Sequence, residues 1–402
     1  MSRMRFSFVE QFTRGAKIKV VGIGGAGGNA IKRMMEAGVG GVEFIAINTD
    51  MQALEKLEGQ RLVQIGLETT RGLGAGGDPE VGRLAAEENA DQIRQALEGA
   101  DLVITTFGGG GGTGSGSGPV CVGIAKEMGA LTVAIVTRPF QFERQQRMMR
   151  AEEGIRQLRT VTDTLIVIPN QKLIDTSLDV KLTDAFYRAD SILMQATKGI
   201  SELLTTAGEI NLDFNDLNTV MKNGGDALLG FGAASGDDRA SVAATEAVMS
   251  PFLEEVDISG ARSILINVSA SRDITLREFD TAVKIITERT GNESNVIAGM
   301  AYNESLNDEL RITLIATGLR QDGRAQPRQE TFSLNNGFTN GNALINGNGY
   351  VGTPVQVPTM VEPEPARNYP PVVANLNPAA IEHGSNGTNN FSVPAIWRRH
   401  RG

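Results

Sequence analysis

Short runs of aliphatic and β-branched residues recur through the first part of the chain, and segments with apolar residues at helical spacing separate them. Such runs are typical of buried strands, whereas apolar positions three and four residues apart are typical of helices. These patterns predict strands at 17–23, 42–47, 61–65, 102–105, 131–136 and 164–168, and helices at 30–37, 79–97, 120–128 and 144–158. Strands that alternate with helices form a parallel sheet covered on both faces, so the predicted fold class is α/β.

The pattern changes after residue 180. One long helix is predicted at 182–204, where apolar residues keep helical spacing throughout. Because strands and helices are more segregated beyond it, we expect a smaller α+β domain with a mixed sheet. Its predicted helices are 214–221, 241–254 and 276–290, and its predicted strands are 263–268, 295–301 and 311–316. The expected organisation is a flexible N-terminus at 1–14, a first domain at 15–180, the central helix and a loop at 181–210, and a second domain at 211–320.

The remaining residues have a different composition. Residues 321–390 are rich in Asn, Gly, Pro and Gln with few charges, a composition that predicts a disordered linker. Residues 391–402 contain the only tryptophan and end in basic residues. Apolar and basic residues after a long tether predict a docking peptide, although a frayed end is the alternative. Its contact residues would be Val393, Pro394, Ile396, Trp397, Arg398 and Arg399.

Composition and charge exclude several classes of function. The net charge of -9 disfavours non-specific binding to nucleic acid, so no nucleic-acid partner is expected. The single cysteine, Cys121, cannot form an internal disulfide and fits a reducing compartment. Its apolar neighbours predict that it is buried and not catalytic. The only histidines, His383 and His400, lie in the tail, which excludes a Ser/His/Asp mechanism or a His-ligated metal in the folded part. With no secretory signal or membrane span recognised, we expect a cytoplasmic protein that meets membranes only indirectly.

The most unusual segment is 108–118, which contains eight glycines between a predicted strand and a predicted helix. Glycine lets backbone N–H groups approach an anion closely, and the following helix directs its positive end to the same place. A flexible linker is the alternative, but linkers seldom join a core strand to a helix within a domain. This segment therefore predicts a phosphate-binding loop.

Two further glycine-rich segments, 22–28 and 71–78, also follow predicted strands. Ligands bind parallel sheets at the carboxyl ends of the strands, where all three segments are expected. Gly22-x-Gly24-x-x-Gly27 fits the dinucleotide fingerprint, so an NAD-dependent oxidoreductase is the rival interpretation. Against it, a dinucleotide fold has no need of the second and stronger phosphate loop. The chain also lacks the P-loop motif, which excludes a P-loop protein.

At Gly110-Gly-Gly-Thr-Gly-Ser-Gly116 the sequence resembles the tubulin/FtsZ superfamily of polymerising GTPases. The resemblance covers about residues 15–320 and is closest to the FtsZ branch. Segments 42–50, 72–82, 139–143 and 211–216 are also similar to that branch, and 393–399 looks like a degenerate form of its C-terminal peptide. The resemblance implies a Rossmann-like GTPase domain, GTP and GDP as ligands, and head-to-tail protofilaments that form the cytokinetic ring at midcell. A divergent homologue that does not hydrolyse GTP is the second alternative.

Several positions depart from the usual FtsZ pattern. Gly109, Ser115 and residues 117 and 118 stand where Met, Thr and two alanines are usual. Arg144-Gln-Gln146 replaces the usual glycine and its basic neighbours, which lowers the local positive charge. We expect the backbone contacts to the nucleotide to survive these changes.

The resemblance also implies the nucleotide contacts. Gly25 to Asn29 would line the phosphates and sugar, and Gly112-Thr113-Gly114 would bind the β and γ phosphates. Glu143 and Arg147 would hold the ribose and nearby groups. Asp190 would accept from the guanine N1 and N2 donors, with Phe186 or Tyr187 stacked on the base. Two simpler roles are an i,i+4 helix pair for Glu143 and Arg147, and a solvated helix charge for Asp190. The full implied set is Gly25, Ala26, Gly27, Gly28, Asn29, Asn48, Asp50, Gly110, Gly111, Gly112, Thr113, Gly114, Ser115, Gly116, Glu143, Arg147, Phe186 and Asp190.

The implied catalytic residues are Asn211, Asp213 and Asp216. Residues of these types before a helix are ordinary N-caps, and the sequence alone favours that role. In the family this loop enters the nucleotide pocket of the next subunit, where carboxylates can orient a water against the γ-phosphate. The implied partners are therefore further copies of the chain, together with membrane-tethering and regulatory division proteins at the tail, and Mg²⁺ is expected on the phosphates.

Overall fold

The computed structural model describes residues 15–174, 181–206, 208–210, 212–253, 258–291 and 294–319. The predicted N-terminal segment 1–14, the linker 321–390, the docking peptide 391–402 and the catalytic candidate Asn211 lie outside the described residues. The strands are β1 (Ile18–Ile23), β2 (Val42–Asn48), β3 (Arg61–Gln64), β4 (Leu102–Gly108), β5 (Leu131–Arg138), β6 (Thr164–Pro169), β7 (Gly225–Ala234), β8 (Ser263–Ala270), β9 (Asn295–Tyr302) and β10 (Leu310–Thr317).

Among the described residues the helices include four short 3₁₀ turns, labelled η. The helices and turns are α1 (Gly24–Glu36), α2 (Met51–Leu54), α3 (Leu67–Thr70), α4 (Pro79–Glu88), α5 (Ala90–Leu97), α6 (Gly112–Glu127), η1 (Gln141–Glu143), α7 (Gln145–Val161), η2 (Asn170–Leu173), α8 (Leu182–Thr205), α9 (Phe214–Met221), α10 (Arg239–Val248), η3 (Ile258–Gly260), α11 (Leu276–Thr290) and η4 (Glu304–Leu306).

One ten-stranded sheet runs through the described residues in the order β3-β2-β1-β4-β5-β6-β7-β10-β8-β9. Strands β1 to β6 are parallel, as predicted for the first half of the chain. Strand β10 pairs antiparallel with β7 and β8, whereas β9 pairs parallel with β8. The α/β class and the mixed pairing of the C-terminal strands are therefore confirmed, and a short parallel pairing of β6 with β7 joins the two parts into one sheet.

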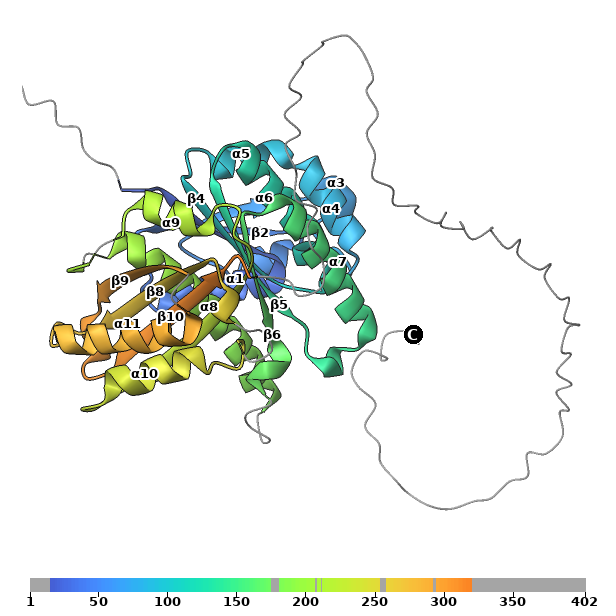
Figure 1. Ribbon diagram of the computed structural model, residues 1–402. Coiled ribbons are helices and arrows are strands. Elements are labelled where there is room, and N and C mark those ends of the chain that lie inside the picture. Colours follow the sequence, from blue (N-terminus) through green and yellow to red (C-terminus); the bar gives the residue numbers. More distant parts are fainter. Residues whose placement is uncertain are drawn as a thin grey trace, which may run out of the picture. The chain divides into compact units, whose positions relative to one another are not determined.

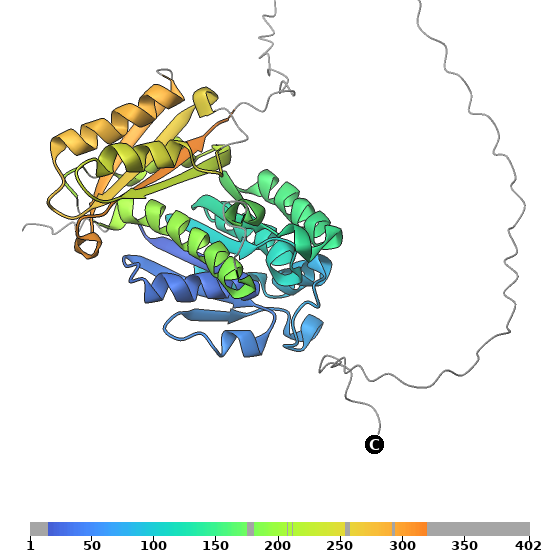
Figure 2. The same ribbon diagram turned by 90° about the horizontal axis from the view of Figure 1, so that it is seen from below.

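Helices cover both faces of the parallel part, as Figures 1 and 2 show. Successive side chains of β1 point to opposite faces of the sheet. Val20 packs into a core cluster with residues of α1, α8 and α9, whereas Val21 packs into a second cluster with residues of α4, α5, α6 and α7. Cys121 is buried in this second cluster, as predicted, and burial raises the pKa of its thiol to about 12. Helices α10 and α11 cover the C-terminal strands with a third cluster.

The central helix α8 supports both parts of the sheet. Its side chains Leu193, Ala196 and Ile200 lie in the same core cluster as Leu265 of β8 and Ile315 of β10. In Figure 2 the helix runs diagonally between the N-terminal and C-terminal elements. No helix among the described residues is both long enough and apolar enough to cross a lipid bilayer.

The structure corrects several predicted boundaries. Helices α1 and α6 begin at Gly24 and Gly112, well before the predicted starts at 30 and 120, so most of both glycine segments is helical. The predicted helix 79–97 is two helices, α4 and α5, which meet at Asn89. The helix predicted at 241–254 ends at Val248.

Strand β7 was not predicted at all. Its glycines weaken the strand pattern, but they allow α10 to pack closely on the sheet. A Cβ on Gly232 would lie 1.9 Å from the carbonyl oxygen of Ala243, and one on Gly230 would lie 2.3 Å from that of Ala247. Tertiary contact with α10 therefore explains residues that local propensity does not favour in a strand.

Candidate nucleotide-binding site

Two helix N-termini meet at the carboxyl edge of the sheet. Helix α1 follows β1 and α6 follows the adjacent β4, and neither helix has a side-chain cap. A Cβ placed on Gly24 would lie 3.4 Å from the backbone nitrogen of Gly114, so the first turns are in contact. Uncapped first turns leave backbone N–H groups free at the positive ends of both helices, and two such ends together favour an anion.

Buried glycines make the close approach of these helices possible. A Cβ on Gly27 would lie 2.6 Å from the carbonyl oxygen of Thr106, and one on Gly116 would lie 1.9 Å from that of Pro79. By contrast, Gly25 and Asn29 are exposed on the outer side of α1. The glycines of the predicted site therefore divide into those that allow packing and those that face outward, where a ligand could reach the backbone.

The loop between β4 and α6 consists of Gly109 to Gly111 and is held from both sides. The Gly109 N–H donates to the carbonyl oxygen of Thr137 (2.8 Å), and the Gly110 N–H donates to Ser115 Oγ (2.8 Å). Ser115 is buried, so its hydroxyl holds the loop and does not face outward. Gly110 has φ 84°, in the region that favours glycine, and a Cβ there would lie 2.4 Å from the Arg147 carbonyl oxygen.

The end of β2 lies beside this loop. Thr49 and Thr113 share a hydrogen bond between their hydroxyls (2.7 Å), which ties the β2 end to the first turn of α6. Asn48 is buried, and its Oδ1 accepts from the Asp50 N–H (3.3 Å). Asp50 caps α2, because its Oδ1 accepts from the N–H groups of Gln52 and Ala53. The predicted residues Asn48 and Asp50 therefore shape this edge through local hydrogen bonds.

Glu143 and Arg147 form the i,i+4 ion pair that was the simpler of their two predicted roles (2.9 Å). The Glu143 side chain is only 8% exposed and also accepts from the Phe140 N–H (2.9 Å). Half of the Arg147 side chain remains exposed beside the Gly110 loop. The residue between them, Arg144, has φ 75° and ψ 161°, a conformation that favours glycine.

Asp190 lies near the N-terminal end of α8 and is 8% exposed. Burial raises the pKa of its carboxyl, and the hydrogen bond and charge of Arg33 oppose this shift. The Arg33 Nε donates to Asp190 Oδ2 (3.2 Å), and its guanidinium carbon lies 4.1 Å from the centre of the Tyr187 ring. A solvated helix charge does not describe this carboxylate.

The sequence patterns did not indicate Arg33 as a residue of this site. It follows Asn29 by four residues on α1, so the two lie on the same face of that helix. That spacing from a predicted contact residue was the available signal. Without the fold, nothing indicated that this face of α1 meets α8.

An aromatic cluster stands next to Asp190. Phe140 and Phe142 stack with ring centres 5.1 Å apart, and Phe186 meets both rings edge-on, at 5.5 and 6.2 Å. Phe186 and Tyr187 are exposed on α8, one turn before Asp190. This arrangement presents exposed aromatic surface beside a buried acceptor, a combination suited to a flat heterocycle with donor groups.

Asp213 and Asp216 are not brought to this site. Asp213 is the N-cap of α9, its Oδ1 accepts from the Asp216 N–H (2.8 Å), and Asp216 Oδ2 accepts from the Asp213 N–H (3.2 Å). Both follow the C-terminal end of α8, and this helix rises about 22 Å between Asp190 and Thr205, at about 1.5 Å per residue. In one copy of the chain, the predicted catalytic carboxylates and the predicted base contact Asp190 therefore lie toward opposite ends of the central helix.

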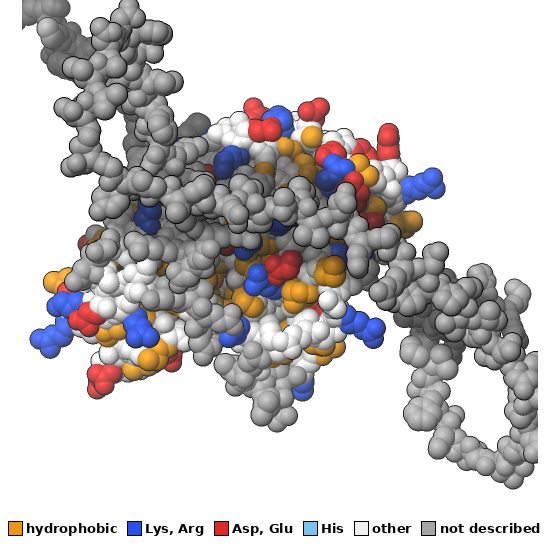
Figure 3. Space-filling view, turned by 45° about the vertical axis from the view of Figure 1, so that its right-hand side comes forward, with side chains coloured by type: hydrophobic (Ala, Val, Ile, Leu, Met, Phe, Trp, Pro, Cys, Tyr) orange, Lys and Arg blue, Asp and Glu red, His pale blue; other side chains and the backbone are white. Residues whose placement is uncertain are grey.

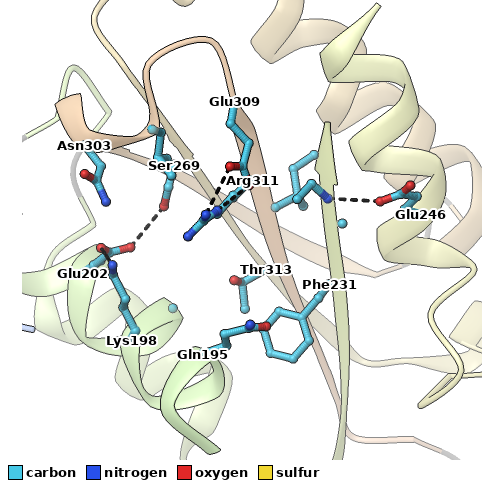
Figure 4. Close-up of a pocket in the computed structure, with 15 residues that line it drawn as sticks. Gln195, Lys198, Glu202, Phe231, Glu246, Ser269, Asn303, Glu309, Arg311 and Thr313 are labelled. Atoms are coloured by element: carbon cyan, nitrogen blue, oxygen red, sulfur yellow. Dashed lines mark hydrogen bonds and ion pairs between the residues drawn. The ribbon is translucent and has the colours of Figure 1, made fainter. Parts of the chain in front are cut away.

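A separate cavity of about 380 Å³ lies between α8 and the C-terminal sheet (Figure 4). Glu202 of α8 accepts from Ser269 Oγ of β8 (3.1 Å) and pairs with Lys198 (3.5 Å) at its edge. None of the predicted site residues lines this cavity.

On the face shown in Figure 3, acidic and basic side chains are interspersed among apolar ones.

The chain matches two family models, each over one part of the sheet. Residues 17–177 match the GTPase domain of the tubulin/FtsZ family, and residues 225–320 match the C-terminal domain of the FtsZ family. The chain belongs to the FtsZ family. The cell division protein FtsZ of Mycoplasmopsis pulmonis is 47% identical over 81% of this chain and 83% of its own length. The namesake from Wigglesworthia glossinidia brevipalpis is 46% identical over 81% of this chain and 85% of its own length.

Solved structures agree with this assignment. The empty FtsZ dimer of M. jannaschii has 45% sequence identity and a TM-score of 0.74, covering 77% of this chain and 89% of that one. The protofilament of CetZ2 from Haloferax volcanii, at 21% identity and a TM-score of 0.63, shares the fold over 77% of this chain and 95% of its own. The resemblance drawn from the sequence is confirmed.

Membership in this family establishes the general function. The chain is a polymerising GTPase of cell division that binds guanine nucleotide and assembles with further copies of itself. The rival interpretation, an NAD-dependent oxidoreductase, has no support from these relatives.

Proposed function

We propose that GTP binds with its phosphates between the N-termini of α1 and α6 and its guanine against α8. The contact between two uncapped helix starts is the observation that carries this proposal. Gly25, Ala26 and Asn29 would face the phosphates and sugar from α1, and Gly112, Thr113 and Gly114 would donate backbone N–H groups from α6. The buried glycines Gly27, Gly28 and Gly116 would act by permitting the packing, and Ser115 and Gly110 by holding the loop.

The base would lie between Asp190 and the aromatic side chains. A carboxylate accepts from both the N1 and N2 donors of guanine, whereas adenine presents a different pattern of donors and acceptors. Phe186 or Tyr187 would stack on the base, and Arg147 would contact the ribose and the nearby phosphate. Because Arg33 already occupies Asp190 Oδ2 and the Tyr187 face, the base must share these groups with Arg33 or displace it.

Mg²⁺ fits the donors at this edge. The hydroxyls of Thr49 and Thr113 are hard oxygen donors beside the proposed phosphate site. They would hold the ion together with phosphate oxygens and water, since Mg²⁺ usually keeps several waters. A bound Mg²⁺ would neutralise phosphate charge.

Hydrolysis would require two copies of the chain. Asp213 and Asp216 lie at the far end of α8 from Asp190, so they cannot reach the nucleotide of their own chain. In a head-to-tail pair, this end of one copy would meet the nucleotide end of the next. The two carboxylates, together with Asn211, would then position a water against the γ-phosphate.

At the cellular level, we propose that the protofilaments form the cytokinetic ring at the midcell division site. Residues 393–399 would dock membrane-tethering and regulatory division proteins. We also propose that the first domain extends over residues 15–180 and the second over residues 211–320.

The shared site is tested with Asp213→Asn. The amide keeps an oxygen that can cap α9 but loses the carboxylate charge, so fold and GTP binding should persist while turnover per subunit falls roughly a hundredfold or more. Phosphate release and sedimentation with GTP, GDP and ATP are measured on the same samples. Asp280→Asn, which removes an exposed carboxylate on α11, is the matched control.

Protein concentration supplies the second measurement. If the site is completed between copies, specific GTPase activity rises with concentration and levels off once assembly is complete. A flat profile would show that each copy carries a complete active site. Normal turnover in Asp213→Asn would show that hydrolysis does not need the Asp213 carboxylate.

A further inference from the structure

Helix α7 presents two arginines, one turn apart, to the two glycine loops beside the proposed phosphate site. Arg147 lies against Gly110, as described above. Arg150 lies against Gly77, where a Cβ would be 3.4 Å from the Arg150 Nη1. Gly77 has φ 77°, so glycine is favoured there, and its lack of a side chain lets the guanidinium approach the loop backbone.

The loop that Arg150 contacts also touches the start of α6. A Cβ on Gly112 would lie 2.8 Å from the backbone nitrogen of Asp78 and 2.9 Å from Ala75 Cβ. The segment from Ala75 to Asp78 therefore contacts both the Arg150 guanidinium and the helix end where the β and γ phosphates are proposed to bind.

Arg150 has no hydrogen-bond or ion-pair partner among the described residues, although it is only partly exposed. The nearby acids of α7 are already engaged, since Glu152 pairs with Arg138 (2.8 Å) and Glu153 pairs with Arg156. A partly buried guanidinium without a counterion is unfavourable, and a ligand anion would relieve that cost. Among the arginines of this helix near the site, Arg147 has its carboxylate and Arg150 does not.

The position of Arg150 points to the outermost phosphate. The base pocket is on α8, which packs against α1, whereas the 71–78 loop leads into α4, which packs against α6. A nucleotide with its base at Asp190 and its phosphates at α1 and α6 would therefore extend toward the 71–78 loop. Its last phosphate would then be the one nearest to Arg150.

We propose that Arg150 reads the γ-phosphate, so that this chain discriminates GTP from GDP partly through a guanidinium on α7. The inference rests on the proposed phosphate site. A guanidinium can donate two parallel hydrogen bonds to phosphate, which an ammonium cannot reproduce. The charge that residues 144–146 lack relative to the usual FtsZ pattern is thereby supplied one to two turns later on the same helix.

The test compares Arg150→Gln and Arg150→Lys with the unmodified full chain. Affinities for GDP and for a GTP analogue with a non-hydrolysable β–γ bridge are measured by competition, below the concentration at which the protein assembles and at constant Mg²⁺. Arg150→Gln should weaken binding of the triphosphate by about tenfold while changing GDP affinity less than about twofold, and Arg150→Lys should fall between. Arg156→Gln, on the same helix, is the control and should change neither affinity.

The ratio of the two affinities decides the outcome. Equal weakening of both nucleotides would mean that Arg150 only supports the loop, and no change would mean that it does not contact the phosphates; either result overturns the inference. If the unmodified chain bound neither nucleotide, the proposed site itself would fail. Should Arg150→Gln unfold, the same ratio is read from Arg150→Lys.

Discussion

Two parts of the structure use buried charge in different ways. One holds the proposed nucleotide site and is built on β1 to β6 (the nucleotide half), and the other is built on β7 to β10 (the C-terminal half). In the C-terminal half, Arg239 is 4% exposed and pairs with Asp273 (3.1 Å), Glu278 (2.7 Å) and Asp308 (3.4 Å). In the nucleotide half, Asp190 is buried to a similar degree, and among the described residues Arg33 is its only ion-pair partner. Removing a buried cation that carboxylates surround destabilises a fold, whereas a buried carboxylate with one partner keeps acceptor capacity for a ligand.

The pKa directions differ in the same sense. Hydrogen bonds from Ser271 and Arg239 lower the pKa of Asp273. Partial burial works to raise the pKa of Glu278, but hydrogen bonds from Arg239 and Thr275 outweigh it, and the pKa is lowered. Burial raises the pKa of Asp190. The C-terminal half therefore favours the ionised form of its carboxylates, whereas burial in the nucleotide half disfavours the ionised form of Asp190. Shifts of this kind are common at functional sites.

The helix starts extend this comparison. Helices α9 and α11 of the C-terminal half begin with capping boxes at Asp213 and Thr275. Helices α1 and α6 begin without side-chain caps and are held by glycine contacts. The starts of α1 and α6 thus leave backbone donors open, and close backbone packing holds both helices in place.

The largest effect is expected from Gly116→Ala on α6. The added methyl would lie 1.9 Å from the Pro79 carbonyl oxygen, so α4 and α6 must separate, at a cost above about 3 kcal/mol in the free energy of unfolding. Gly123→Ala on the same helix is the control, because its Cβ meets nothing within 4 Å. It should stabilise by about 0.5–1 kcal/mol through helix propensity. Denaturant unfolding measures both variants, and equal effects would show that glycine contacts do not hold this half.

Arg239→Gln should cost about 2–3 kcal/mol of unfolding free energy, because three carboxylates lose their common partner. The value stays below that of a fully buried pair, since Asp273 and Asp308 are more than half exposed and water screens them. Arg272→Gln is the control. Its ion pair with Glu304 is mostly exposed, so the loss should be below about 0.5 kcal/mol.

The pH dependence of this variant checks the mechanism. Lowered folded pKa values mean that Asp273 and Glu278 stabilise the fold above their ordinary values of 3.8 and 4.5 and lose that contribution as pH falls. The difference in stability between the unmodified protein and Arg239→Gln should therefore shrink between about pH 5 and about pH 3. A constant difference would mean that Arg239 acts through packing alone.

The smallest of these effects is expected from Asp190→Asn, which should weaken GTP binding by about tenfold and reduce the preference for GTP over ATP. Asp184→Asn, which changes an exposed acid on the same helix, should leave both unchanged.

The pH dependence of stability has the opposite sign for Asp190. Because the folded pKa of Asp190 is raised, the unmodified protein should lose stability relative to Asp190→Asn as pH rises through that pKa, above the ordinary 3.8. A slope like that of the Arg239 network would erase the contrast between the halves.

Much of the fold followed from local patterns. Apolar runs such as 131–136 belong to strands buried on both faces, and their alternation with helices indicates a parallel sheet whatever the details of packing. Helix α11 was predicted with its observed bounds, Leu276–Thr290, and the structure shows that a capping box of Thr275 and Glu278 begins it. The glycine signature at 110–116 was specific enough to indicate the family.

Other features required the tertiary structure. Glycine has low intrinsic helix propensity, so the early starts of α1 and α6 are visible only once Gly27 and Gly116 are seen against neighbouring backbones. The pairing of Arg33 with Asp190 joins residues far apart in sequence on two helices, and no local pattern reports it. The sequence by itself determined the sheet class and the family, because both depend on residue types at short spacing. Only the tertiary structure decided which helix ends meet and which charges remain open, because these depend on contacts between distant segments.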